Sequence, residues 1–180
     1  MWSIVKSIVW VVQNNWKLAD KGIWEFRNND QHFTFSKLLC WVAVDRAIKI
    51  SNLIQGGKSA KKWEGLREEI HTDIMQHSWS EKKQSFMQSY NSDHLDASVL
   101  LMEYYGFIEA RDPKYVKTVK AIERELMYED LLFRYKNEDD FGTPSSSFTV
   151  CSFWFINSLY KIGEEKKSKV LFDKLLSYSN

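Results

Sequence analysis

The stretch FTFSKLLCWVAVDRAIKISNLIQGG, from Phe33 to Gly57, decides the fold class. Apolar and polar residues along it occupy alternating faces at helical spacing, as Leu38 and Lys49 illustrate. The run contains no proline, and its only glycines form a pair at its end, where such a pair marks a turn. We therefore predict a long helix from about Phe33 to Ile54.

Segments on both sides of this helix show the same period. The chain of 180 residues contains only two prolines and seven glycines, and most of them fall between these segments. The further segments expected to be helical are 2–12, 63–75, 95–106 with Asp93 as N-cap, one opened by Asp112 and Pro113, 148–162, and one after Gly163 through Val170, Leu171, Leu175 and Leu176. We therefore predict an all-α protein of antiparallel helical hairpins. Such hairpins build a bundle, a solenoid or a closed α/α toroid, and the lack of a fixed-period repeat disfavours the solenoid.

The composition disfavours several classes of partner. Lysine and arginine number 25 against 24 acidic residues, a net charge of +1, so no strong field gathers nucleic acid or anionic lipid. The chain is rich in aromatic residues, with eight tryptophans, eight tyrosines and eleven phenylalanines. Most of them are expected in the core, and an exposed minority offers flat apolar platforms for sugar rings. We expect neither nucleic acid nor a membrane as a partner.

Cysteine usage and the N-terminal residues indicate a cytoplasmic protein without a metal. Cys40 and Cys151 lie far apart in apolar helical contexts, which predicts reduced thiols, and the four histidines show no ligand spacing. The apolar run Ile8–Val12 is too short to span a membrane, and no signal-peptide pattern follows Met1.

The segment Gly22–Arg27 carries the most unusual residues outside the expected helices. It reads GIWEFR and places a carboxyl group, Glu25, beside the indole of Trp24. If the segment is extended, Glu25 and Arg27 point to one face and Trp24 to the other. A carboxyl group against apolar aromatic surface has a raised pKa, which suits a general acid. A surface ion pair between Glu25 and Arg27 is the alternative.

Several motifs in the chain resemble one enzyme family in their order and spacing. They are DKGIWEFR at 20–27, HFTFSK at 32–37, WVAVDRA at 41–47, FMQSY at 86–90 with LDAS at 95–98, RY at 134–135 before DDFG at 139–142, and Phe148 with CSFW at 151–154. This series is similar to the acid-bearing part of glycoside hydrolase family 15, in its bacterial and archaeal glucoamylase or trehalase form. The similarity spans nearly the whole chain.

The resemblance implies a fold and a reaction. The fold is an (α/α)6 barrel of the six-hairpin glycosidase type, with the active site where loops converge at one end. The reaction is inverting hydrolysis of α-glucosidic bonds in an α-glucan or an α-linked disaccharide, without metal or organic cofactor. Glu25 matches the general acid, and a second carboxylate, roughly 6.5 to 9.5 Å away, activates water on the opposite face of the sugar.

The resemblance also suggests substrate-binding residues. Arg134 resembles a substrate-binding arginine whose donors grip vicinal hydroxyl groups, although an ion pair with Asp139 or Asp140 is the alternative. The other residues expected to line the cleft are Trp24, Arg27, His32 and Lys37. As an alternative, Trp24 only packs beside the Glu25 carboxyl group without contacting sugar. For His32, the alternative is a role as a helix cap or packing residue.

The resemblance predicts that residues 1–180 form one partial catalytic domain, about half of the toroid. The family carries a β-sandwich domain and several barrel helices before the equivalent of Trp2, and a Ser-Glu motif with the general base after the segment that resembles 175–180. We therefore expect this chain to carry the acid without the base and to be inactive alone. Helices facing absent neighbours would expose apolar sides, which favours association with the remainder of the barrel or self-association.

Two other hypotheses stay open at this point. The first is a non-catalytic helical remnant that binds carbohydrate or another protein, which the expected lack of a base and Ser145, where many family members carry an acidic residue, would favour. The second is a prenyltransferase-type toroid, which needs a metal-ligand spacing of Asp, Cys and His that this sequence lacks.

Overall fold

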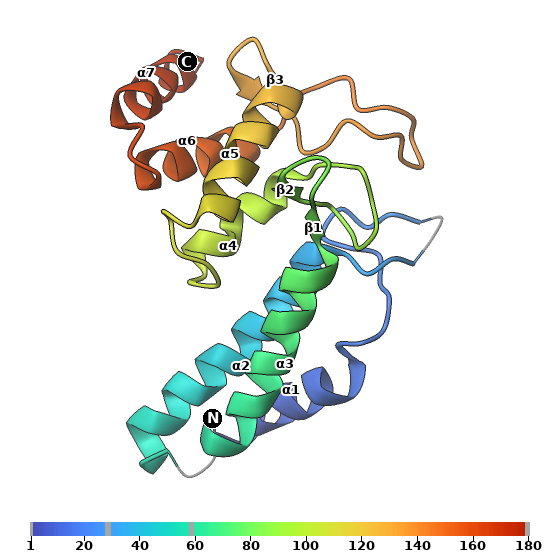
Figure 1. Cartoon of the computed structure of the whole chain (residues 1–180), viewed down its shortest axis with the longest axis vertical. Helices are drawn as coiled ribbons and strands as arrows, with labels where there is room; N and C mark the ends of the chain where they lie inside the picture. Colours follow the sequence, from blue (N-terminus) through green and yellow to red (C-terminus); the bar gives the residue numbers. More distant parts are fainter. Residues whose placement is uncertain (1, 28–29, 58–59, 179–180) are drawn as a thin grey trace. The chain divides into compact units, whose positions relative to one another are not determined.

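The computed structural model describes residues 2–27, 30–57 and 60–178, and helices dominate this part of the chain (Figure 1). The predicted all-α class is therefore confirmed. Two compact units form, one within residues 1–77 and one within residues 78–180, and each is described by itself. The expectation of a single partial barrel domain stays a prediction.

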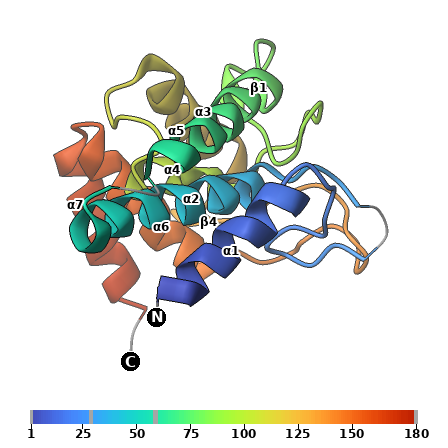
Figure 2. The same ribbon diagram turned by 90° about the horizontal axis from the view of Figure 1, so that it is seen from below.

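The first unit consists of α1 (Trp2–Asn15), α2 (Thr34–Gln55) and α3 (Ala60–His77). Helices α2 and α3 form an antiparallel hairpin (Figure 1), and α1 contacts α2, beside which it lies in Figure 2. Helix α2 ends where Gly56 adopts a left-handed conformation with φ 56°, as the glycine pair predicts. The core of this unit includes the fully buried residues Leu38, Val44, Ile70 and Ile74.

The second unit surrounds α5 (Pro113–Leu126), which contacts a 3-10 helix η1 (Ala97–Leu100) and α6 (Thr149–Lys161). The remaining elements are α4 (Leu101–Tyr104), α7 (Glu165–Leu176), β1 (Trp79–Ser80), β2 (Ser85–Phe86), β3 (Met127–Tyr128) and β4 (Leu131–Leu132). The buried hydroxyl of Tyr115 donates to the carbonyl of Leu100 at 2.8 Å and lies 2.9 Å from the hydroxyl of Ser158. This residue therefore joins η1, α5 and α6.

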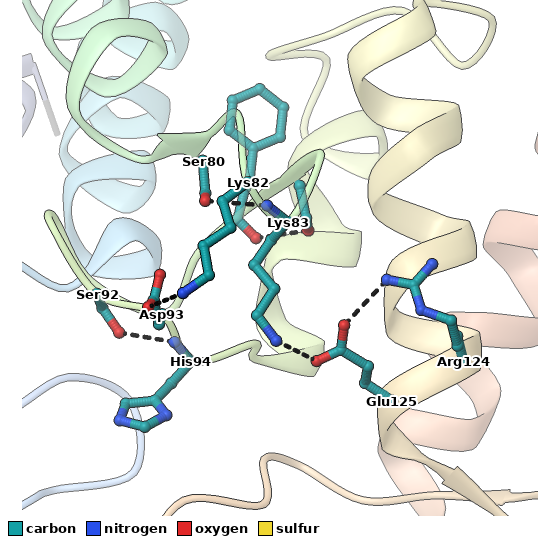
Figure 3. A network of polar contacts seen from close by, with 10 residues as sticks. Ser80, Lys82, Lys83, Ser92, Asp93, His94, Arg124 and Glu125 are labelled. Carbon is teal, nitrogen blue, oxygen red and sulfur yellow. Dashed lines mark hydrogen bonds and ion pairs between the residues drawn. The ribbon is translucent and has the colours of Figure 1, made fainter.

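The predicted start of the fourth helix is wrong. Asp93 caps no helix, and its carboxylate pairs with Lys82 at 2.9 Å (Figure 3). Asp96, three residues later, accepts a hydrogen bond from the backbone N–H of Ser98 at 2.7 Å and caps η1 instead. Both aspartates precede apolar residues at suitable spacing, so local sequence does not separate them.

A second polar contact in Figure 3 fastens the β1–β2 hairpin to α5. Lys83 in the hairpin pairs with Glu125 of α5 at 2.8 Å, and Glu125 also accepts from Arg124 at 2.9 Å. The two short hairpins, β1–β2 and β3–β4, pair only two residues on each strand. Segments this short carry no readable alternation of apolar and polar residues, and the sequence does not predict them.

Both cysteines are unpaired thiols, as predicted. Cys151 is fully buried, and burial raises the pKa of its thiol well above the ordinary value. Among the helices of residues 2–27, 30–57 and 60–178, none combines the length and the apolar character that a bilayer crossing requires.

Candidate active site

The loop that carries Glu25 is closed at its base. We call residues 20–31 the Glu25 loop, of which 20–27 and 30–31 are described; it connects α1 to α2 (Figure 1). Asp20 and Gln31 pair as an isolated antiparallel bridge, with both backbone N–H to O distances at 2.9 Å. The two ends of the loop are therefore held side by side.

Inside the loop the backbone turns and is not extended. The N–H of Glu25 donates to the carbonyl of Gly22 at 3.2 Å, and the N–H of Phe26 donates to the carbonyl of Lys21 at 2.9 Å. Glu25 itself has φ 56°, a left-handed conformation that is uncommon for residues other than glycine. The extended geometry that would place Glu25 and Arg27 on one face is therefore not found.

The loop rests on Phe33, the residue before α2. Phe33 is buried, and the ring of Phe26 stacks on it with 5.2 Å between centroids. Gly22 has φ 67°, and a Cβ there would lie 2.8 Å from Cγ of Phe33. Only glycine fits this position without displacing the aromatic ring.

Two polar side chains hold the loop and the residues just before it. One carboxylate oxygen of Asp20 accepts from the N–H of Gly22 at 2.6 Å and from the hydroxyl of Ser36 at 2.7 Å. Lys37 is buried, and its ammonium group donates to the carbonyl of Trp16 at 2.6 Å and to that of Leu18. Burial lowers the pKa of Lys37, and the charge of Asp20 partly offsets this.

The structure brings four of the predicted site residues together on and beside this loop. Glu25, Arg27 and His32 are exposed, and Trp24 is half-buried. Within the described part of the chain, the Glu25 carboxylate makes no hydrogen bond or ion pair, so the pairing with Arg27 is not seen there. Lys37, the fifth, is buried, and its ammonium group donates to backbone carbonyls just before the loop.

Arg134 belongs to the second unit, where an acidic partner holds it. We call residues 134–142 the Arg134 segment. A terminal nitrogen of Arg134 lies 3.1 Å from the carboxylate of Asp139, so the ion pair considered from the sequence is present. The guanidinium group lies over the ring of Tyr135, 4.9 Å from its centroid, and Nε of Arg134 is buried without an acceptor among the described residues. The side chain is thus oriented and keeps unused donor capacity.

Tyr135 and Asp139 complete this cluster. The Tyr135 hydroxyl donates to the Asp139 carboxylate at 2.6 Å, and Asp139 also accepts from the N–H of Phe141 at 2.7 Å. The Tyr135 hydrogen bond is the main cause that lowers the pKa of Asp139. Burial, with a smaller contribution from that hydrogen bond, raises the pKa of Tyr135 to about 12.

The sequence motifs include Asp139 as an alternative ion-pair partner of Arg134, but they predict no turn-forming role for Asp20 or Asp139. Asp20 and Asp139 each accept the backbone N–H two residues further on, and each stands two or three residues before a glycine, Gly22 or Gly142. An aspartate shortly before a glycine is typical of such side-chain-capped turns. That signal was available and points to loop structure.

The sequence model for glycosyl hydrolases family 15 matches residues 1–179. The chain belongs to this family. A trehalase from Mycolicibacterium smegmatis is 41% identical over 184 residues, which cover 100% of this chain and 27% of that protein. A trehalase from Thermoplasma acidophilum is 33% identical, covering 100% of this chain and 31% of that protein. This family 15 chain therefore spans less than a third of the length of these relatives.

Solved structures show the same fold as the family 15 chain. A wild-type glycosidase superimposes with a TM-score of 0.75 at 11% sequence identity, covering 87% of this chain and 41% of that one. A glycosidase variant in complex with glucose gives a TM-score of 0.73 at 10% identity. The predicted fold class, helical hairpins of the six-hairpin glycosidase type, is confirmed.

Proposed function

We propose that this chain supplies the acid-bearing part of a glycoside hydrolase that cleaves α-glucosidic bonds, with Glu25 as the general acid. The observation that carries the proposal is the Glu25 loop. Its base is closed by the bridge between Asp20 and Gln31, while the Glu25 carboxylate is exposed and has no partner among the described residues. A general acid must be held in place and yet able to reach the leaving oxygen.

The proposed reaction is the inverting hydrolysis of the family. The Glu25 carboxyl group gives its proton to the glycosidic oxygen as the bond from that oxygen to the anomeric carbon breaks. A water molecule, deprotonated by a second carboxylate, attacks the anomeric carbon from the opposite face. We assign that base to no residue of 1–180, because the resemblance places its Ser-Glu motif after the segment that resembles 175–180, and the Ser-Glu pair at 80–81 does not lie there.

We propose trehalose as the substrate to test first. Two relatives at 41% and 33% identity carry the name trehalase, which favours an α-linked glucose disaccharide over a longer glucan. Trp24, Arg27 and His32 would contact the sugar beside the acid. Arg134, oriented by Asp139 and Tyr135, would bind sugar hydroxyl groups. We assign Lys37 to the support of the loop, because its ammonium group is buried on two carbonyls.

An exchange experiment tests the proposal. Residues 1–180 replace the matching segment of the Mycolicibacterium smegmatis trehalase, and glucose release from trehalose is measured. We expect the chimera to be active, and Glu25→Gln to lower kcat by about 10²- to 10⁴-fold. The unfused chain is expected to release no glucose from trehalose or maltose.

Glu129 provides the matched control for this substitution. It is an exposed glutamate with φ 48°, in the turn between β3 and β4. Glu129→Gln should leave the kcat of the chimera within about twofold of its starting value, because surface substitutions of this kind have small effects. A chimera that keeps full activity with Glu25→Gln would remove Glu25 from the acid role. A chimera that binds trehalose without cleaving it would favour the non-catalytic alternative.

A further inference from the structure

The backbone of Glu25 needs support from outside the residue. Its φ of 56° is disfavoured for any side chain with a Cβ, because that atom crowds the following carbonyl oxygen. Free of restraint, a glutamate in a loop adopts negative φ. The hydrogen bonds of the surrounding loop must therefore hold this conformation.

Both peptide groups that flank Glu25 are held by hydrogen bonds. The N–H of Glu25 donates to the carbonyl of Gly22, and the N–H of Phe26, which shares a peptide group with the Glu25 carbonyl, donates to the carbonyl of Lys21. Fixing both peptide groups fixes φ and ψ of the residue between them. The orientation of Glu25 therefore depends on the carbonyl groups of Lys21 and Gly22.

Asp20 orients the first of these carbonyl groups. The N–H of Gly22 and the carbonyl of Lys21 belong to one planar peptide group and point in opposite directions. Asp20 binds that N–H at 2.6 Å, which turns the Lys21 carbonyl toward the N–H of Phe26. A single carboxylate oxygen of Asp20 thus orients the acceptor for the N–H of Phe26, the residue that follows Glu25.

Asp20 is itself fixed to the rest of the unit. Its backbone forms the bridge with Gln31, and the carboxylate oxygen that binds Gly22 also accepts from Ser36 in the first turn of α2 at 2.7 Å. One residue therefore joins the two ends of the loop, its internal turn and the following helix. Lys37, the next residue of α2, holds the carbonyls of Trp16 and Leu18 just before the loop.

We propose that Asp20 is a positioning residue that holds Glu25 in its left-handed conformation and so directs its carboxyl group. The proposal rests on the proposed function in one respect, that the carboxyl group being directed is the general acid. Removing the side-chain acceptor at position 20 frees the Lys21–Gly22 peptide group. Glu25 then relaxes toward negative φ, and its carboxyl group leaves the productive position.

The first arm of the test uses the chain as it is and needs no activity. Amide hydrogen exchange and backbone couplings are measured by NMR for the wild type, Asp20→Ala and Asp20→Asn. Asp20→Ala should raise exchange at Gly22 and Phe26 by about tenfold and move Glu25 to negative φ. Asp20→Asn keeps a side-chain oxygen that can accept from Gly22, so it should retain most of the protection.

Asp112 gives the matched control for this arm. Its carboxylate accepts the N–H of Lys114, also two residues further on, at 2.8 Å, but it caps α5 in the other unit. Asp112→Ala should leave exchange in the Glu25 loop unchanged. If Asp20→Ala also removes the exchange protection of Leu38 in the core of α2, the unit has unfolded. The experiment is then repeated with Ser36→Ala, a milder change that removes only one of the hydrogen bonds to Asp20. Unchanged exchange at Phe26 in an intact unit overturns the proposal.

The second arm measures catalysis in the trehalase chimera. We expect Asp20→Ala to lower kcat by about 10²-fold while KM changes by less than about twofold, because a misplaced acid affects the chemical step. Asp20→Asn should restore most of kcat. If Asp20 only stabilised the fold, Asp20→Ala would lower the amount of folded enzyme. It would not lower kcat at nearly constant KM, and Asp20→Asn would not restore kcat.

The two arms separate the two proposals. If Glu25→Gln abolishes activity but Asp20→Ala leaves kcat unchanged, the acid assignment stands and the positioning role is overturned. If Glu25→Gln leaves the chimera active, the acid assignment fails. The exchange arm then still decides whether Asp20 holds the Glu25 backbone.

Discussion

The Glu25 loop and the Arg134 segment are built on the same device. In each, an aspartate forms an isolated backbone bridge, Asp20 with Gln31 and Asp139 with Gly142. Each aspartate also accepts the N–H two residues further on, at 2.6 Å in the first case and 2.7 Å in the second. A side chain that caps a turn in this way gives a short loop a defined shape without regular secondary structure.

The two regions differ in which part of the site residue is held. Asp20 acts on the backbone around Glu25 and leaves the carboxylate of Glu25 exposed and without a partner among the described residues. Asp139 binds the side chain of Arg134 directly, at 3.1 Å. A proton donor needs its carboxyl group available, whereas a binding residue gains from a fixed side chain. The comparison indicates that each segment is held in the way its proposed role requires.

Alanine at the two loop glycines gives the largest expected effect. Gly22→Ala should lower the free energy of unfolding by about 3 kcal/mol, because the added Cβ meets Phe33 at 2.8 Å and the residue has positive φ. Gly142→Ala, also at positive φ but with no atom within 4 Å of the added Cβ, should cost about 1 kcal/mol. Urea denaturation of both variants measures the difference, which isolates the packing of the Glu25 loop on Phe33. Equal costs would mean that this packing contributes nothing.

The helices follow from the sequence because their signals are local. The end of α2 at Gly56 and the start of α5, with Asp112 as N-cap and Pro113 in the first turn, are confirmed. Each depends on residues within one helical turn, which a single sequence displays directly. The choice between Asp93 and Asp96 does not follow from local signals, because both precede apolar residues at a spacing that suits an N-cap.

The conformation of the Glu25 loop does not follow from local signals. The left-handed Glu25 depends on Asp20, on the contact of Gly22 with Phe33 and on the hydroxyl of Ser36. The Gly22–Phe33 contact spans eleven residues, and no periodic pattern encodes it. Lys37 shows the same limit, because a lysine at a helix start is expected to be exposed and only the fold reveals the carbonyls that bury it.

An intermediate effect should come from the hydrogen bond between Tyr135 and Asp139. Tyr135→Phe removes this 2.6 Å bond and should cost about 1.5 kcal/mol at neutral pH. The pKa of Tyr135 is raised to about 12, so this stabilisation is fully present below about pH 10 and is lost as pH rises through about 12. The pKa of Asp139 is lowered, so it is also lost as pH falls below the ordinary value of 3.8.

The measurement for Tyr135→Phe is the difference in unfolding free energy from the wild type across the pH range. The difference should be constant near neutral pH and shrink at both ends. A difference that stays flat into acid and alkali would show that Asp139 does not depend on the Tyr135 hydroxyl. Arg134 would then be held by its ion pair alone, and the contrast with the Glu25 loop would weaken.

The smallest effect sharpens the comparison most. Glycine adopts positive φ without penalty, so Glu25→Gly should raise the free energy of unfolding by about 0.5 kcal/mol despite the greater freedom of the unfolded chain. Glu129→Gly, at φ 48° in the β3–β4 turn, should give a similar rise.

In the trehalase chimera only Glu25→Gly should abolish glucose release. That result would mean that the backbone strain at Glu129 serves only to form the turn, whereas the backbone strain at Glu25 places the carboxyl group where the reaction needs it. A loss of stability with Glu25→Gly would show instead that the Glu25 side chain itself supports the loop.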